Sequence, residues 1–362
     1  MPLQSSGQLT ARDIANEFGY SRGSTDGIRI GDYRGQGFTN PNNTTVRIPT
    51  SENVTNDPNG SVRFSDFYGG RLTIVVNYFG AAAEIKPGDA YGRFSFIDNN
   101  GNHTLRAVVG NDTFGQFKPF SSNNSAGKRV VILVNEDIGS DKTANTSCAL
   151  RTGTGWNSDT VMRILVGPDG EILGAGGDGG DGVNAGNGLP GGVGSSGLGV
   201  QFEGVGGTGV VIQSGGKISG GAGGGGAGGG AWVRQERFFG EGPIRRATGG
   251  EGGGGAGFPA GNRADRVNGG AGVDGTHQGS NPGAEGGFGG NGGGISGTIV
   301  NSGSRGVDGT TSGSRQEDPA RYSGGGGGAA GAAIRRTVPT VIITNEGPPS
   351  QLAGSTVETG VT

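Results

Sequence analysis

The stretch GGDGGDGVNAGNGLPGGVGSSG, residues 176–197, decides the fold of this chain. Glycine occupies every third position along it, and Ala185 is the one break in that register. Three residues per turn is the period of the polyproline II helix, which makes no hydrogen bonds within itself. Its backbone N–H and C=O groups therefore need partners from outside. We expect this stretch to form extended threefold helices that bond to neighbouring helices of the same kind, as in polyglycine II.

The same spacing of glycine returns through the second half of the chain, at residues 220–229, 249–255, 269–275, 283–292 and 303–309. Glycine supplies 87 of the 362 residues, whereas an average protein has about 7%. Glycine on two of the three faces would let backbones approach closely enough to bond, and the third face would carry side chains outward. We expect the contact faces to include Gly179, Gly223 and Gly289, and the outward face to include Asp178 and Asn291. Such a bundle needs no large apolar core, which fits an apolar content of 30%.

Other glycine-rich structures fit these residues less well. A collagen triple helix shares the period of three but needs abundant proline, and the chain has 15 prolines. A calcium β-roll is suggested by residues 176–184 and weakly by 269–277, but that fold needs tandem copies nine residues apart. No GxxxxGK(S/T) phosphate loop occurs. A disordered linker would not keep glycine in register around strands such as Val210–Ile212, although disorder and an irregular glycine solenoid stay open as alternatives.

The fold class predicted for the whole chain is mostly β and irregular. Residues 1–70 are expected to form a small N-terminal attachment module, with a short amphipathic helix at 8–18 and a repeated strand-turn unit at 26–35 and 59–69. β-Branched and aromatic runs at 72–79, 93–97, 104–109, 128–134 and 161–166 predict an antiparallel β-sandwich over residues 71–173. The glycine-rich polyglycine II helix sandwich follows over 174–333, and a C-terminal strand and tail over 334–362.

Composition excludes several function classes. The net charge is −3 with 16% charged residues, so no global field favours nucleic acid or an anionic membrane. The one cysteine, Cys148, rules out an intrachain disulfide and a thiolate cluster, and His103 and His277 lie in different regions. We therefore predict no cofactor, no metal site and no catalytic residues. The chain shows no signal-peptide pattern and no apolar run of about 18 residues, which predicts synthesis in a cytoplasm without a membrane anchor.

Two stretches carry a resemblance to phage proteins. The apolar strand and PDGEILGAGGDGGDG within residues 161–182, followed by VVIQSGGKISGGAGGGGAGGG at 210–230, resemble the glycine-rich domain of phage tail-fibre adhesins. The helix ending in EFG, with IRIGDYRG and VRFSDFYGG after it, is similar to the start of many phage structural proteins. The resemblance implies a virion tail protein, at the distal fibre or the baseplate, whose helices form a sandwich with receptor-binding loops at the outer end. The N-terminal half does not resemble the adhesins' own attachment domain, so how the chain joins the tail stays open.

Three functions compete on these grounds. The first is a non-enzymatic fibre-tip or receptor-binding protein that recognises a bacterial surface glycan or outer-membrane protein. The second is a baseplate or tail-fibre connector in which the glycine stack is a rigid spacer. The third is a polysaccharide-cleaving enzyme, which would need two carboxylates at a defined separation; Glu236, Glu241, Asp265 and Glu317 show no such pairing. We expect other tail or baseplate proteins to bind the N-terminal half, and a trimer if the chain is fibre-like.

The connections between the expected helices predict which end binds. We place the helices at 174–199, 220–230, 249–261, 269–279, 283–294, 303–313 and 324–333, with antiparallel neighbours. One end then collects the connections 200–219, 262–268 and 295–302, and the other collects 231–248, 280–282 and 314–323. The second end carries the aromatic and arginine side chains typical of an interface: Trp232, Arg234, Arg237, Phe238, Phe239, Arg245, Arg246, Arg321 and Tyr322. We predict that this end binds the receptor, while some aromatics, Trp232 above all, could instead cap the stack.

Overall fold

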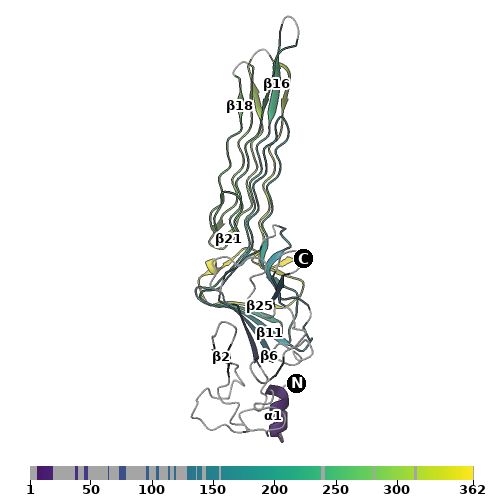
Figure 1. Ribbon diagram of the computed structural model, residues 1–362, viewed down its shortest axis with the longest axis vertical. Coiled ribbons are helices and arrows are strands. Elements are labelled where there is room, and N and C mark those ends of the chain that lie inside the picture. The colour runs from purple at the N-terminus through teal and green to yellow at the C-terminus, as the bar shows by residue number, and fades with distance from the viewer. Residues whose placement is uncertain are drawn as a thin grey trace.

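A computed structural model of the chain shows an elongated molecule, with a body of β-strands near both termini and a long bundle of extended segments that rises away from it (Figure 1). The structure describes residues 6–18, 37–39, 45–47, 64, 73–78, 95–97, 103–105, 113–114, 118–119, 129–135, 137–140, 144–154, 156–237, 241–279, 282–313 and 316–361. Most of the strand-turn repeat predicted at 26–35 and 59–69 lies outside these residues.

The predicted N-terminal helix is present as α1, Ala11–Phe18. Thr10 and Asp13 cap its first turn reciprocally: the Thr10 N–H donates to Asp13 Oδ2 at 2.9 Å, and the Asp13 N–H donates to Thr10 Oγ1 at 3.2 Å. The Thr10 hydroxyl also donates to Asp13 Oδ2, at 2.6 Å, and this bond together with the one from the Thr10 N–H holds the pKa of the Asp13 carboxyl below its ordinary value of 3.8. Leu9 and Ile14 are buried, so the helix packs through one apolar side.

The body is built from three sheets of mostly parallel strands, to which successive passes of the chain add one strand each. One pass supplies β10 (Cys148–Arg151), β11 (Val161–Val166) and β12 (Glu171–Leu173), and the next supplies β13 (Ser196–Val200), β14 (Thr208–Ile212) and β15 (Lys217–Ser219). A later pass supplies β24 (Ile334–Arg336), β25 (Val341–Asn345) and β26 (Leu352–Ala353). The first strands of the three passes pair in parallel with one another, and so do the second strands and the third strands, as in a three-sided β-helix.

Further strands extend these sheets. The first sheet has the order β27-β24-β13-β10-β5-β4, the second β25-β14-β11-β8-β3, and the third β26-β15-β12-β9. The added strands are β3 (Thr73–Tyr78), β4 (Ser95–Ile97), β5 (His103–Leu105), β8 (Arg129–Val134), β9 (Asp137–Ile138) and β27 (Glu358–Thr359). Two separate antiparallel pairs, β1 (Gly37–Thr39) with β2 (Thr45–Arg47) and β6 (Thr113–Phe114) with β7 (Lys118–Pro119), complete the described strands before residue 129.

Apolar side chains on the inner faces of the three sheets form one core. Ile164, Val210 and Ile343 are register neighbours across the second sheet, and Ile164 and Val210 are fully buried. Leu150, Leu198 and Ile334 make the equivalent row in the first sheet. Along β11 the buried and less buried side chains alternate, as a strand with one face on a core requires.

The prediction of an antiparallel sandwich over 71–173 is wrong in strand direction. β3, β8 and β11 pair in parallel, and the sheets recruit strands from beyond residue 173. Parallel strands need long crossover connections, and here the glycine segments supply two of them, between β12 and β13 and between β15 and β24. The unbroken apolar run VVIL within β8 is typical of a buried parallel strand rather than of an antiparallel one with a solvated face.

The glycine-rich segments bond to one another with a period of three. In the central segment, residues 220–230, three consecutive N–H groups donate to three different neighbouring segments: Gly224 to Gly192, Gly225 to Gly253 and Gly226 to Ser304, at 2.7–2.9 Å. The carbonyls of the same three residues accept from three further segments, from Gly328, Gly180 and Gly290, at 2.7–2.9 Å. The central segment thus bonds to six neighbours, the arrangement that threefold helices without internal hydrogen bonds require.

The predicted contact and outward faces of these segments are confirmed. A Cβ atom added at Gly179, Gly223 or Gly289 would lie closer than 3.0 Å to the backbone of a neighbouring segment. Asp178 and Asn291 are exposed. Asn291 also connects two segments, because its Oδ1 accepts a hydrogen bond from the Gly272 N–H at 3.0 Å.

The prediction of a single helix over residues 174–199 is wrong. The chain reverses around Ala185, which has a positive φ of 48°. Residues on either side bond antiparallel to each other, with Leu189 donating to the carbonyl of Asp181 and Gly192 to that of Asp178. The single break in the glycine register therefore marks a turn and not a tolerated substitution within a helix.

The connections 200–219, 262–268 and 295–302 meet at the body, as predicted. Residues 208–212 are strand β14 of the second sheet. In the loop 262–268, Arg266 donates to Asp137 Oδ2 at 2.6 Å, lies 3.6 Å from a Glu171 oxygen, and stacks 4.2 Å from the centre of the Phe258 ring. The short hairpin of β20 (Ile295–Ser296) and β21 (Ile299–Val300) lies at the base of the bundle (Figure 1).

Candidate functional site

The end of the bundle far from the body carries two small antiparallel sheets (Figure 1). The first has the order β17-β16-β23, formed by β16 (Ala231–Gln235), β17 (Ile244–Ala247) and β23 (Gln316–Arg321). The second has the order β18-β19-β22, formed by β18 (His277–Gln278), β19 (Gly283–Glu285) and β22 (Thr310–Ser312). The predicted meeting of the connections 231–248, 280–282 and 314–323 at one end is thus confirmed for the described residues, and we call this end the distal tip.

The sequence explains why the glycine-rich segments are followed by strands here. The segments AWVRQ and IRRA lack the glycines that backbone contact requires, and their large side chains alternate as in half-buried strands. On one face of the first sheet Ala231, Val233 and Ala247 are buried, packed with Ala284 of β19. The other face is more open and carries the side chains with polar and aromatic chemistry.

The register of β16 and β17 sets four side chains in a checkerboard on that open face. Trp232 is the Cα partner of Arg246, and Arg234 is the partner of Ile244. Each arginine is therefore flanked across the strands by an apolar group, and the two arginines are diagonal neighbours, a spacing of about 7–8 Å in an antiparallel pair.

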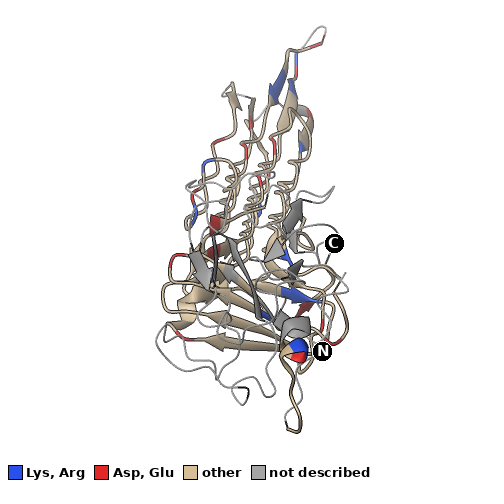
Figure 2. Cartoon of the chain, turned by 60° about the horizontal axis from the view of Figure 1, so that its bottom comes forward, with Lys and Arg blue, Asp and Glu red and all other residues tan. Residues whose placement is uncertain are grey.

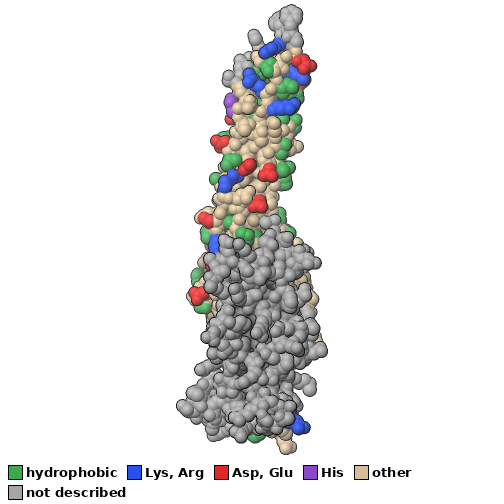
Figure 3. All heavy atoms as spheres, in the orientation of Figure 1, with side chains coloured by type: hydrophobic (Ala, Val, Ile, Leu, Met, Phe, Trp, Pro, Cys, Tyr) green, Lys and Arg blue, Asp and Glu red, His purple; other side chains and the backbone are tan. Residues whose placement is uncertain are grey.

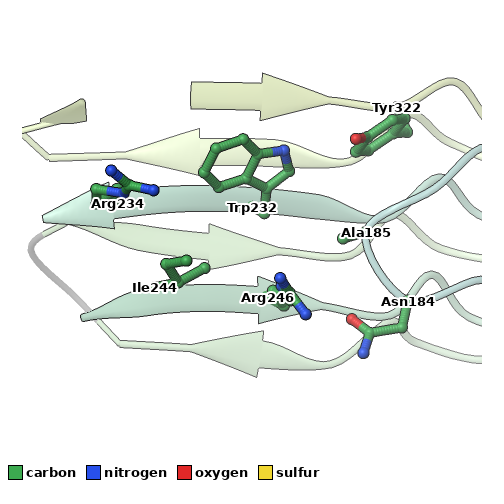
Figure 4. A pocket seen from close by; sticks show the side chains of 7 residues that line it. All are labelled: Asn184, Ala185, Trp232, Arg234, Ile244, Arg246 and Tyr322. Carbon is green, nitrogen blue, oxygen red and sulfur yellow. The ribbon is translucent and has the colours of Figure 1, made fainter. Parts of the chain in front are cut away.

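These side chains form the floor of a pocket of about 400 Å³ (Figure 4). It is lined by Asn184, Ala185, Trp232, Arg234, Ile244, Arg246 and Tyr322. Figure 4 shows Arg234 and Ile244 toward the outer ends of the strands, Trp232 and Arg246 in the middle, and Asn184, Ala185 and Tyr322 toward the glycine helices. The turn at Ala185 closes the inner end of the pocket.

The pocket is cationic and carries apolar surface. In the part of the tip that the structure describes, no acidic side chain lines it. Arg234 Nη1 lies 3.9 Å from Glu241 Oε1, but the Glu241 side chain is 85% exposed, so that ion pair contributes little. Arg234 Nε is buried and has no hydrogen-bond partner among the described residues. Strands of the tip carry Lys or Arg positions, coloured blue in Figure 2, and Figure 3 shows basic side chains together with acidic ones at this end of the molecule.

The structure brings four of the nine predicted site residues together, namely Trp232, Arg234, Arg246 and Tyr322. Arg245 belongs to the opposite face of β17 and packs against Gly279. Arg321 donates from Nε to Thr311 Oγ1 at 3.1 Å, and Arg237 is exposed just beyond the end of β16. Phe238 and Phe239 lie outside the described residues.

Three lining residues were missed from the sequence: Ile244, Asn184 and Ala185. Ile244 precedes the two arginines of its strand, and only the hairpin register shows which of its neighbours share its face. Asn184 and Ala185 belong to the segment that was expected to continue as a helix. Their signal was present in the sequence, because Ala185 is the break in the glycine period.

Other reactive groups in the described part of the chain do not form a site. Burial raises the pKa of the Cys148 thiol to about 12, although Arg335 nearby lowers it. No group of three His, Cys, Asp or Glu side chains among the described residues can hold a metal ion. Of the carboxylates considered for glycosidic cleavage, Asp265 lies in the loop at the body and Glu241 lies at the distal tip. None of the described helices has the length and hydropathy of a membrane span.

Comparisons with known proteins place the chain in a family. The structure has a distant likeness to the crystal structure of the gp37–gp38 adhesin tip complex of the bacteriophage S16 long tail fibre, with 20% identity, 82% of this chain and 88% of that chain covered, and a TM-score of 0.32. A comparison with curated protein sequences finds no match. The family model described as phage tail fibre adhesin Gp38 matches residues 101–357, more than half of the chain. This chain therefore belongs to the Gp38 family of phage tail fibre adhesins.

Proposed function

We propose that this tail-fibre adhesin recognises the host cell surface through its distal tip, without enzymatic activity, and that the glycine-rich bundle is a polyglycine II sandwich that carries the tip away from the virion. The observation that carries the proposal is the pocket at the end of the bundle, where Trp232, Tyr322 and two arginines converge. Aromatic and arginine side chains dominate the binding energy of most interfaces. The tip is also the point of the molecule farthest from the body (Figure 1).

The opposite end suits attachment to the tail. Helix α1, one of the described elements of the N-terminal region, lies beyond the sheets on the side away from the bundle (Figure 1). We propose that residues 1–70 bind other tail-fibre or baseplate proteins at the distal fibre. In this division residues 71–173 begin the strand body, 174–333 are the glycine domain, and 334–362 return to the body as its last strands.

The receptor-binding residues in this proposal are Trp232, Arg234, Arg246 and Tyr322 in the pocket, Arg237, Arg245 and Arg321 elsewhere on the distal tip, and Phe238 and Phe239, which lie outside the described residues. The test is phage adsorption with alanine at Phe238, Phe239 and Tyr322 together. We expect adsorption to be lost while particle assembly and the melting temperature of the protein stay nearly unchanged. Normal adsorption by this variant would place the receptor site elsewhere on the molecule.

A connector with a purely structural spacer is the second candidate function. The rigidity of a hydrogen-bonded bundle would serve it equally well, but a spacer needs no open pocket at its free end. The two functions differ in what the tip contacts. If the alanine variant fails to assemble into particles, the tip binds another virion protein and the connector is the better reading.

A further inference from the structure

We infer that the pocket at the distal tip binds a single sugar unit that carries a carboxylate or a phosphate, an inference that rests on the proposed receptor-binding function. A volume of about 400 Å³ falls in the range of roughly 300–1,000 Å³ for small-molecule sites. The pocket is open to the solvent, and its size suits one small ligand lying on the strands.

The cationic groups point to an anionic ligand. Arg234 and Arg246 share one face of the sheet, and no acidic side chain among the described residues lines the pocket between them. Arg234 also has a buried Nε without a hydrogen-bond partner. A buried donor without a partner is unfavourable, and an anion in the pocket would satisfy it. The planar guanidinium fork matches carboxylate and phosphate oxygens.

The remaining lining residues point to a sugar as the carrier of that anion. Trp232 lies between Arg234 and Tyr322 in Figure 4, and its indole is half-buried, so it offers an apolar surface on which the C–H face of a pyranose can pack. Asn184 supplies an amide that can both donate to and accept from hydroxyl groups. An acidic sugar has an apolar ring face, hydroxyl groups and a charged group, which match the indole, the amide and the guanidinium groups of the pocket. A free inorganic anion would make no contact that needs the indole.

The two tryptophans of the chain make this testable without a label. Trp156 is buried in the body, 6% exposed, and donates from Nε1 to the Thr152 carbonyl at 2.8 Å. Trp232 lies in the pocket. A sugar bound at the tip should therefore change the fluorescence of Trp232 and leave that of Trp156 unaltered.

The experiment titrates the full chain with glucuronic acid, glucose 6-phosphate and glucose, each up to roughly 10 mM, a concentration suited to millimolar affinity. We expect at least one of the two charged sugars to shift the Trp232 fluorescence and glucose not to do so. Binding by glucuronic acid alone identifies a carboxylate site, and binding by glucose 6-phosphate alone identifies a phosphate site. The shift should weaken as salt is added, since a charged contact at the surface is screened.

Arg234→Gln and Arg246→Gln should each weaken binding of the charged sugar about tenfold, the loss expected for one charge-assisted hydrogen bond. Arg305→Gln is the matched control, because Arg305 is exposed on the bundle and outside the pocket. Unchanged melting temperatures keep the comparison valid. Equal losses in all three variants would mean unspecific attraction to the positive charge of the protein and would overturn the inference.

Three further outcomes would overturn it. Glucose binding as strongly as the charged sugars would mean a neutral-sugar site. No response to any of the three sugars, in a protein that still binds host cells, would remove the sugar ligand and leave the proposed function standing. Arg234 and Glu317 are register partners across β16 and β23; binding of a charged sugar that appears only in a Glu317→Gln variant would mean that the native pocket does not take an anion.

Discussion

A single added methyl group should have opposite effects at two neighbouring glycines of the bundle. Gly328 is buried, donates its N–H to Gly224 at 2.7 Å and accepts from Gly303 at 2.9 Å. A Cβ there would come within 3.0 Å of the Gly192 backbone, which real Cβ atoms essentially never do. Gly326 belongs to the same segment but is exposed, and a Cβ there would have no heavy atom within 4 Å.

The magnitudes follow from this geometry. Gly328→Ala must push two backbones apart, at a cost of about 1–3 kcal/mol for overpacking, with its two interhelical hydrogen bonds weakened as well. Gly326→Ala meets no obstacle and has no positive φ to strain, so it should stabilise the protein by about 0.4–1 kcal/mol through the lower entropy of the unfolded chain. The two variants should therefore differ by about 1.5–4 kcal/mol in the free energy of unfolding.

Guanidinium chloride unfolding of the full chain measures this difference, with the midpoints compared at equal slope. The same substitution in the same segment controls for helix propensity, expression and tag effects. If both variants lower the midpoint by similar amounts, or if neither changes it, the close approach of backbones in the bundle is wrong.

Three other perturbations test the body and the outer surface of the bundle. Arg266→Gln removes the ion pair with Asp137, and because the arginine side chain is 40% exposed the loss should be about 1 kcal/mol, seen as a lower denaturation midpoint. Cys148 should resist iodoacetamide at pH 8 in the folded protein, since burial raises its pKa to about 12; rapid labelling without denaturant would contradict this. Asp308 accepts the Gly324 N–H at 2.9 Å, which lowers its pKa, so its stabilising contribution is present above its ordinary pKa of 3.8 and is lost as the pH falls through the lower value in the folded protein. The difference in melting temperature between the native chain and Asp308→Ala should accordingly shrink on acidification, and a difference that grows would refute the assignment.

The bundle could be predicted because close contact between backbones restricts particular positions of the sequence to glycine. Where two backbones touch, a Cβ does not fit, so residues such as Gly223 and Gly289 must recur at the helical period. The exposed third face has no such requirement, and Asp178 stands there. The turn at Ala185 was not predicted, because a single residue that breaks the glycine period can mark either a turn or a tolerated substitution, and the sequence alone does not distinguish the two.

The direction of the strands could not be predicted because it depends on connections that are far apart in sequence. β14 and β25 are neighbours in one sheet although most of the glycine domain lies between them. The lining of the pocket could not be predicted either, because it depends on the register in which β16 pairs with β17. Arg245 and Arg246 are adjacent in the chain, yet the pairing of β16 with β17 sends them to opposite faces, and Arg246 alone reaches the pocket.

Binding of the purified chain to host cells tests the central claim, that the distal tip makes the contact with the host, most directly. Trp232→Ala changes an aromatic residue in the pocket, and Phe288→Ala changes one that is 54% exposed on the bundle away from it. The account predicts that Trp232→Ala weakens cell binding at least about tenfold, as truncation of an interface anchor worth 2 kcal/mol or more does, and that Phe288→Ala binds like the native chain. Native binding by Trp232→Ala together with lost binding by Phe288→Ala would contradict it, and would move the contact from the tip to the side of the bundle.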